Sequence, residues 1–171
     1  MTVLYYPDAR LRRRATMLPG SAFATPGLER YAAGMMADLA GVELCDVLAG
    51  PQVDFDPPWR VLAVRTPAGI TTLCNPEMKD EADEVVEFET SASFLSIPVQ
   101  LPAPRKLTVS YRTVDGSRRE VVCDPGGARA VWQGMAALEG RLPVDRMTPM
   151  GALAFVSKYR RKLGKTLTVP S

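Results

Sequence analysis

The sequence contains no histidine in 171 residues. Without histidine a protein has no imidazole general base, no Ser-His-Asp or Cys-His catalytic relay, and no imidazole metal ligand. Any chemistry that this chain performs must therefore use carboxylates, thiols, hydroxyls, amides or backbone dipoles.

Cysteine, net charge and long apolar runs are also scarce. The three cysteines, Cys45, Cys74 and Cys123, are an odd and scattered set, which favours reduced thiols over a disulfide framework. The 21 basic and 19 acidic residues leave a net charge of only +2, too small by itself to indicate nucleic acid binding. The sequence has no apolar run of membrane-span length and no apolar signal core. We therefore expect a cytoplasmic protein with no membrane partner.

The composition is that of an ordinary globular protein, with 46% hydrophobic and 23% charged residues. This length predicts one domain, residues 1–171, with a proper core. The N-terminal segment, residues 1–19, reads as a short strand and a basic stretch. Apolar residues at helical spacing predict a helix from Pro26 to Ala40, for which Thr25 is a plausible N-cap.

Alternating apolar residues predict antiparallel strands in the middle of the chain. The expected strands are 61–64 paired with 70–73, and 106–113 paired with 120–123 around the turn Asp115-Gly116. A helix is expected from Pro125 to Leu138, and a last helix from Thr148-Pro149 into a basic run. The acidic stretch 80–89 and the proline-rich stretch 99–106 read as loops. The fold class is therefore α+β.

Five fragments occur in an order that resembles peptide deformylase over nearly the whole chain. They are the opening Tyr6–Arg12, then Leu48–Asp54, Leu73-Cys74-Asn75-Pro76, Leu95-Ser96-Ile97-Pro98, and the segment from Leu138-Glu139-Gly140 to Asp145-Arg146. The second matches the end of the family motif G-x-G-L-A-A-x-Q, and the fourth the end of E-G-C-L-S-x-P. The fifth follows the position of Q-H-E-x-D-H. The resemblance implies antiparallel sheets around a central helix, with N-terminal and C-terminal helices.

The resemblance also implies a catalytic divalent metal, which this chain lacks the ligands to hold. The family binds the metal through the motif cysteine and two helical histidines, and a glutamate between them shuttles protons. Here Phe94 stands at the cysteine, Gln133 and Ala137 at the histidines, and Gly134 at the glutamate. Neighbouring motif positions also differ, at Ala92, Ser93, Trp132 and Ala136. We therefore expect no metal, no cofactor and no metal-dependent deformylation.

Two interpretations of the altered pocket remain open. In the first, Phe94 contacts Gly134 or Ala137 and fills the volume that the metal site would occupy, which leaves an inert pocket. In the second, the small residues widen the pocket and make it apolar for a new ligand. Glycine inside a helix costs about 1 kcal/mol relative to alanine, so a large group such as Phe94 or a ligand is expected close to Gly134.

Gln52 and the backbone N–H of Leu95 match the groups that hold the developing oxyanion in the family. An intact oxyanion hole binds a carbonyl even without a nucleophile. The alternative is that Gln52 only satisfies buried backbone groups. Cys45 matches the first glycine of the first motif and is a candidate nucleophile. However, the neighbouring Asp46 would raise the pKa of its thiol, and a lone cysteine is often a small buried hydrophobe.

The predicted site is the cleft formed by residues 45–52, 93–95 and 132–137. Gln52, Leu95, Cys45 and Asp46 are its candidate catalytic residues; its candidate binding residues are Val47, Leu48, Gly50, Ser93, Phe94, Trp132, Gln133, Gly134 and Ala137. One hypothesis is a binding protein for a small acyl, aminoacyl or peptide-like ligand. The other is a metal-free acyl-transfer or cyclisation enzyme in a biosynthetic pathway.

The last predicted helix carries a basic cluster: Lys158, Arg160, Arg161, Lys162 and Lys165. In some deformylases a basic C-terminal helix contacts the ribosome, so the resemblance permits a ribosome or protein contact here. A charged, solvated helix face explains the same residues.

Overall fold

The computed structural model describes residues 1–167. Over that range it contains three α-helices and one five-stranded antiparallel sheet. In chain order the elements are α1 (Pro26–Ala40), β1 (Val47–Ala49), β2 (Val61–Thr66), β3 (Gly69–Glu89), β4 (Val99–Arg112), β5 (Arg118–Cys123), α2 (Pro125–Leu138) and α3 (Pro149–Leu167). The predicted α+β class is confirmed.

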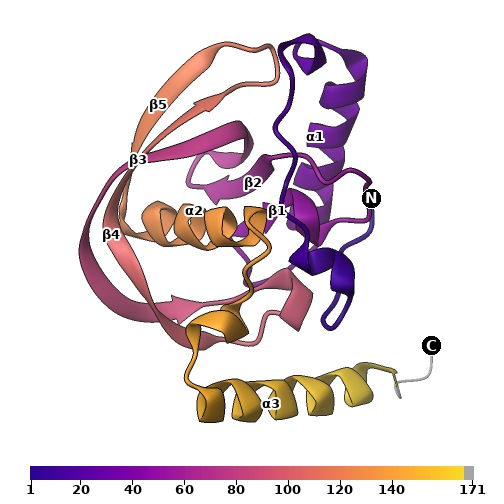
Figure 1. The fold of residues 1–171 in the computed structure, drawn as a ribbon, viewed down its shortest axis with the longest axis vertical. Helices are drawn as coiled ribbons and strands as arrows, with labels where there is room; N and C mark the ends of the chain where they lie inside the picture. The colour runs from indigo at the N-terminus through magenta and orange to yellow at the C-terminus, as the bar shows by residue number, and fades with distance from the viewer. Residues whose placement is uncertain (168–171) are drawn as a thin grey trace.

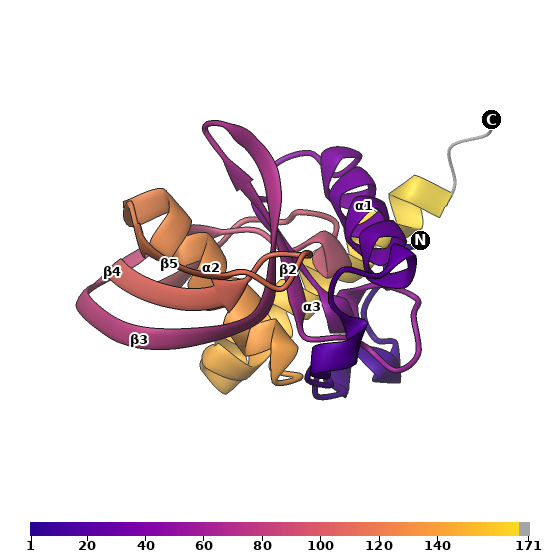
Figure 2. The same ribbon diagram turned by 90° about the horizontal axis from the view of Figure 1, so that it is seen from above.

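The strands follow one another across the sheet in chain order, from β1 to β5. The β3 and β4 strands form a long ribbon that curves around α2 (Figures 1 and 2). Two irregularities in the pairing of β3 with β4, at residues 74–77 and 78–80, interrupt the register. Such bulges bend a strand and increase its twist, which is how the ribbon curls around the helix.

The helices α1 and α2 have the bounds that the sequence predicts. Thr25 caps α1, since its hydroxyl oxygen accepts a hydrogen bond from the backbone N–H of Leu28 at 3.4 Å. Asp124 caps α2 in the same way, by accepting from the N–H of Gly127 at 2.6 Å. Each helix starts with a proline, whose missing N–H costs nothing in a first turn. Local signals therefore fully determine where these two helices begin.

The predicted loops at 80–89 and 99–106 are wrong, because both segments are strands. Residue Glu84 of β3 pairs with Pro104 of β4, and Val86 pairs with Pro102. Carboxylates and prolines are disfavoured in strands, so the local sequence hides the ribbon. The prolines are tolerated because β5 pairs with β4 only from Leu107 onward, which leaves the proline segment at an edge of the sheet.

Smaller differences concern the first residues and the cysteines. The strand expected within residues 1–19 is only an isolated bridge between Val3 and Val53. The strand expected over 70–73 continues past Cys74, and all three cysteines are free. No helix within residues 1–167 is both long and apolar enough to cross a membrane.

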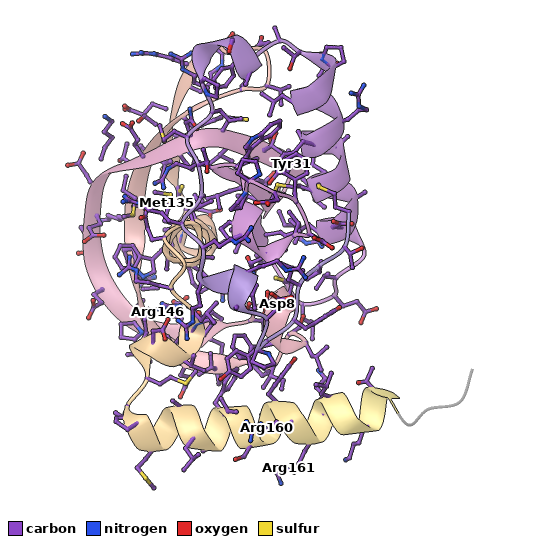
Figure 3. All side chains as sticks on the ribbon, turned by 45° about the vertical axis from the view of Figure 1, so that its right-hand side comes forward. Asp8, Tyr31, Met135, Arg146, Arg160 and Arg161 are labelled. Carbon is purple, nitrogen blue, oxygen red and sulfur yellow. The ribbon has the colours of Figure 1, made fainter. Side chains whose placement is uncertain are left out.

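The short strands β1 and β2 separate two helices. Leu62 and Val64 pack with residues of α2 in one core cluster, called the α2 cluster below. Val61 and Ala63 pack with residues of α1 in a second one, the α1 cluster. This alternation explains the continuous apolar run in β2, which is buried on both faces. In Figure 3, Met135 of α2 and Tyr31 of α1 mark the two sides. A third cluster joins α3 to the N-terminal segment.

Candidate functional site

Phe94 belongs to the third cluster, with residues of α3 and of the N-terminal segment. The side chain is fully buried. Its ring stacks on Tyr6 with a centroid distance of 4.9 Å, and it contacts Phe155 and Tyr159 of α3 at 5.3 and 5.4 Å. The aromatic ring therefore anchors α3 and the N-terminal segment to the 3-10 turn Ala92–Phe94.

Gly134 is approached by two aliphatic side chains of the sheet. A Cβ atom added at this position would lie 2.7 Å from Cγ2 of Val47 and 2.8 Å from Cδ2 of Leu62. Val47 and Leu62 are therefore the nearest neighbours of position 134, and contact of Phe94 with Gly134 or Ala137 stays a prediction. The glycine allows α2 to lie directly against β1 and β2, and Val47 occupies the volume where a longer side chain at 134 would begin.

Gln133 faces the end of β3 and not an open pocket. Its side-chain amide donates a hydrogen bond to the carbonyl oxygen of Thr90 at 2.6 Å. The thiol of Cys45 lies 3.8 Å from the same carbonyl oxygen and 3.2 Å from that of Val47. A backbone acceptor at the end of β3 is thus satisfied by side chains from α2 and from the segment before β1.

Arg129 closes the same edge one turn earlier on α2. Its guanidinium donates to the carbonyl oxygen of Phe88 and forms an ion pair with Asp46 at 2.8 Å. Beyond residue 74, β3 has no partner strand on its β2 side in the described chain. Carbonyl groups two residues apart point to the same side of a strand. Arg129 and Gln133 therefore occupy the acceptors that an added extended chain would use.

The matching oxyanion groups are both engaged within the protein. The side-chain amide oxygen of Gln52 accepts from the backbone N–H of Ala49 at 3.0 Å, and its side-chain nitrogen donates to the hydroxyls of Ser91 and Ser93 at 3.3 and 3.1 Å. The N–H of Leu95 donates to the carbonyl oxygen of Ala92 at 3.1 Å. The geometry therefore fits the structural interpretation of Gln52, which holds β1 and the 3-10 turn together.

The environment of Cys45 keeps it protonated. Burial raises the pKa of its thiol, and hydrogen bonding to Val47 and Ala92 only partly offsets that effect; the charge of Asp46 raises the pKa further, while Arg65 lowers it. Because the thiolate is the nucleophilic form, a buried thiol with a raised pKa is a poor nucleophile. Cys45 behaves as a small hydrophobic residue of the α1 cluster.

The other predicted residues are mostly buried or packed against the core. Leu48 and Ser93 are fully buried beside the site. Gly50 has no room for a side chain, since an added Cβ would lie 1.9 Å from the carbonyl oxygen of Trp59. Ala137 packs against the α2 cluster. Trp132 packs against the same cluster and also lines a small hollow with residues of the β3–β4 ribbon.

A buried carboxylate, Glu89, lies beside this site and was missed in the sequence. It is 3% exposed and accepts a hydrogen bond from the guanidinium of Arg146. Among the described residues, its second oxygen and two nitrogens of Arg146 have no hydrogen-bond partner. Burial raises the pKa of Glu89, against the opposing effect of Arg146. Nothing in the local pattern distinguishes it from the exposed carboxylates before it.

The basic cluster lies along α3, at the base of the molecule (Figure 3). The helix buries Phe155 and Tyr159 and exposes Arg160 and Arg161. Lys162 reaches back to the carbonyl oxygen of Leu95 at 2.6 Å. Contact of this helix with the ribosome or another protein remains a prediction.

Comparisons with known proteins agree with the resemblance in the sequence. A family model described as Polypeptide deformylase matches residues 1–152. A peptide deformylase of Stenotrophomonas maltophilia (strain R551-3) is 26% identical over 169 residues, covering 96% of this chain and 95% of the relative. A peptide deformylase of Opitutus terrae is 27% identical over 164 residues, covering 86% and 84%.

Solved structures support the fold independently. A peptide deformylase from Legionella pneumophila superposes with a TM-score of 0.89 at 20% identity, covering 99% of this chain and 98% of that structure. One from Ehrlichia chaffeensis gives a TM-score of 0.86 at 16% identity, covering 98% of each chain. At these identities the solved structures are evidence for the fold alone, whereas the family model matches most of the sequence. The chain therefore belongs to the polypeptide deformylase family.

Proposed function

We propose that this protein is a cytoplasmic deformylase-family member without metal-dependent deformylase activity, and that its cleft binds an acyl, aminoacyl or peptide-like group. The observation that carries the first part is the contact of Val47 with Gly134. In the motif G-x-G-L-A-A-x-Q, position 47 corresponds to the second glycine. A valine there removes the space that a glutamate at 134 would need.

The residues at the ligand positions do not fit a metal. The side chains of Phe94 and Ala137 carry no donor atom, and the amide nitrogen of Gln133 is directed at a carbonyl oxygen. Within residues 1–167, no group of three or more histidine, cysteine, aspartate or glutamate side chains is arranged to hold an ion.

The direct test combines elemental analysis with a hydrolysis assay. The purified protein, prepared without chelators and in the presence of added iron(II), zinc or nickel, is expected to retain no stoichiometric metal. It is also expected to release no formate from formyl-Met-Ala-Ser. About one tightly bound ion per chain, or formate release above the buffer rate, would overturn the proposal.

A reversion experiment tests the steric argument. The fourfold variant Phe94→Cys, Gln133→His, Gly134→Glu and Ala137→His restores the ligands and the proton shuttle, but its glutamate collides with the side chain of residue 47. A fivefold variant that also carries Val47→Gly is expected to bind metal at least as well and to be more stable than the fourfold variant. Equal stability of the two would show that Val47 is not the obstacle.

The ligand class follows from the edge of β3. An extended peptide-like chain that reached this edge would replace Arg129 at the carbonyl of Phe88 and Gln133 at that of Thr90. Main-chain hydrogen bonds to a strand edge are a general way to bind such a chain. Because the protein supplies its own donors there, binding requires that these side chains move away.

Arg129→Ala should therefore bind N-acetyl-Met-Ala-Ser more tightly than the unaltered protein, as measured by isothermal titration calorimetry. Arg30→Ala is the matched control, since it removes an exposed arginine of α1, a helix that contributes no residue to the predicted cleft. Equal binding by all three proteins, or absence of binding in all three, would contradict this assignment of the cleft.

The geometry favours binding over metal-free catalysis. An acyl-transfer enzyme needs donors that are free to receive the oxyanion, but Gln52 and Leu95 both have partners inside the protein. It also needs an activated nucleophile, whereas burial raises the pKa of Cys45. Cys45→Ser is therefore expected to leave ligand binding unchanged.

A further inference from the structure

A separate hollow of about 650 Å³ opens between the end of β2, the strand β5 and the first turn of α2. Its lining includes Val64, Leu73 and Val131, which are buried residues of the α2 cluster. Asp46 is the one residue that it shares with the predicted cleft. The ion pair of Asp46 with Arg129 lies between the two sites.

The second and third residues of α2 have no side chains, which leaves room for the hollow. Gly126 and Gly127 form its first turn, and both line the hollow. The helix cap holds this opening in place, since Asp124 accepts from the N–H of Gly127. On the facing strand, Val121 and Cys123 of β5 complete an apolar wall.

The size and lining suit the apolar part of a small molecule. Ligand pockets in proteins commonly enclose several hundred cubic ångströms, with mostly apolar walls and a few polar groups that orient the ligand. Here the apolar floor is continuous with the core, and the polar groups are confined to the rim. They include the carboxylates of Asp46 and Asp124 and the guanidinium of Arg65.

The rim offers hydrogen-bond acceptors more than donors. Arg65 directs its N–H groups at the carbonyl oxygens of Leu39 and Cys45. The carboxylate of Asp46 uses one oxygen for Arg129, and a carboxylate can accept several hydrogen bonds. The rim therefore carries two carboxylates and one guanidinium, and the N–H groups of that guanidinium already have backbone partners. An incoming ammonium group would find free carboxylate acceptors at this rim.

We propose that this hollow is a binding site for a small amphipathic amine, with its apolar body over Val131 and its ammonium group at Asp46. The site does not depend on the ligand proposed for the cleft. It can therefore be tested without opening the cleft.

The experiment compares hexylamine with hexanoate, which has a similar apolar chain but the opposite charge. Backbone amide shifts of Gly126, Gly127 and Cys123 report binding by NMR. Hexylamine is expected to shift these amides and to bind about tenfold more tightly than hexanoate, the value of one hydrogen bond to a charged group. Equal affinities would overturn the assignment of the head group, and no shift with hexylamine would overturn the site.

Val121→Trp places a large ring in the hollow from a half-exposed position of β5, 39% exposed, and should abolish hexylamine binding. Val86→Trp is the matched control, because Val86 is an exposed strand valine that does not line the hollow. Circular dichroism checks that both variants fold. Retained binding in folded Val121→Trp, or lost binding in folded Val86→Trp, would place the ligand elsewhere.

Cys123 supplies an independent readout with a thiol-specific reagent. Cys45 and Cys74 are fully buried, whereas Cys123 is partly exposed in the wall of the hollow. Bound hexylamine should slow modification of Cys123 by methyl methanethiosulfonate in the unaltered protein and in Val86→Trp. Unchanged modification rates at saturating hexylamine would contradict the proposed position of the apolar chain.

Discussion

The two sides of α2 differ in how the space beside the helix is used. On the side of Arg129 and Gln133, long polar side chains donate hydrogen bonds to the edge carbonyl groups of Phe88 and Thr90. On the side of Gly127 and Val131, short residues leave a hollow of about 650 Å³. This comparison indicates that polar side chains fill the space beside α2 where a strand edge exposes carbonyl groups. Where no strand edge needs such partners, the space stays open.

The largest effect is expected from Phe94→Ala, which removes the ring that packs against Tyr6, Phe155 and Tyr159. The ring is fully buried, so the free energy of unfolding should fall by about 3–5 kcal/mol. Urea unfolding measures this change. Phe88→Ala is the control, because that ring is 58% exposed and its loss should cost little. Similar costs for the two variants would contradict the placement of Phe94.

Gln52→Ala sharpens the comparison by testing whether the carbonyl-binding pair is structural. The substitution leaves the buried N–H of Ala49 without its acceptor and should destabilise the protein by about 1–3 kcal/mol. Gln100→Ala, at an exposed position of β4, should be nearly neutral. If Gln52→Ala kept full stability and lost only ligand binding, Gln52 would be a functional residue after all.

Gly134→Ala and Gly164→Ala make the same change in two helices and should have opposite signs. Alanine favours a helix by about 1 kcal/mol over glycine. At 134 the new methyl group meets Val47 and Leu62, and overpacking should outweigh that gain, for a net loss of about 1–2 kcal/mol. At 164 nothing lies within 4 Å of the new Cβ, so stability should rise. Thermal unfolding of both variants decides the matter.

The smallest effects concern two glutamates that face arginines. Burial raises the pKa of Glu89. For Glu139, burial also acts to raise the pKa, but Arg60 and Arg14 outweigh it and the pKa is lowered. A raised carboxyl pKa means that the folded protein holds the proton more tightly. The stability contributed by protonated Glu89 is therefore lost as the pH rises above the ordinary value of about 4.3 toward the folded pKa.

Glu139 has the opposite sign, since a lowered pKa contributes stability that is lost as the pH falls below about 4.3. Glu89→Gln should therefore abolish the loss of stability that occurs as the pH rises above about 4.3. Glu139→Gln should abolish the loss of stability that occurs as the pH falls below about 4.3. Urea unfolding between about pH 3 and pH 7 measures both. The same pH profile for the two variants would show that their environments are alike.

Local signals account for the elements that the sequence predicted correctly. The helices α1 and α2 begin where a capping side chain and a proline occur together, and both signals lie within four residues of the boundary. The ribbon of β3 and β4 was missed because its evidence is not local. Residues such as Glu84 and Pro104 form strands because they pair with each other, and neither favours a strand alone.

The candidate site also combines features that are local in the sequence with contacts that depend on distant residues. The sequence identified the positions at which the metal ligands were replaced, since motif order is readable along the chain. The contacts that close the cleft join residues far apart in the sequence: the residue numbers of Gln133 and Thr90 differ by 43, and those of Arg129 and Asp46 by 83. Periodicity and composition carry no information on such pairs.

The sequence by itself determined the family, the α+β class and the absence of any imidazole, and therefore the kinds of chemistry available. Only the tertiary structure decided that Val47 crowds position 134, that Glu89 is buried and that a hollow opens beside Gly127. The reason is physical. The identity of a chemical group is set by covalent structure, whereas its burial, its partner and its pKa depend on which distant segments pack against it.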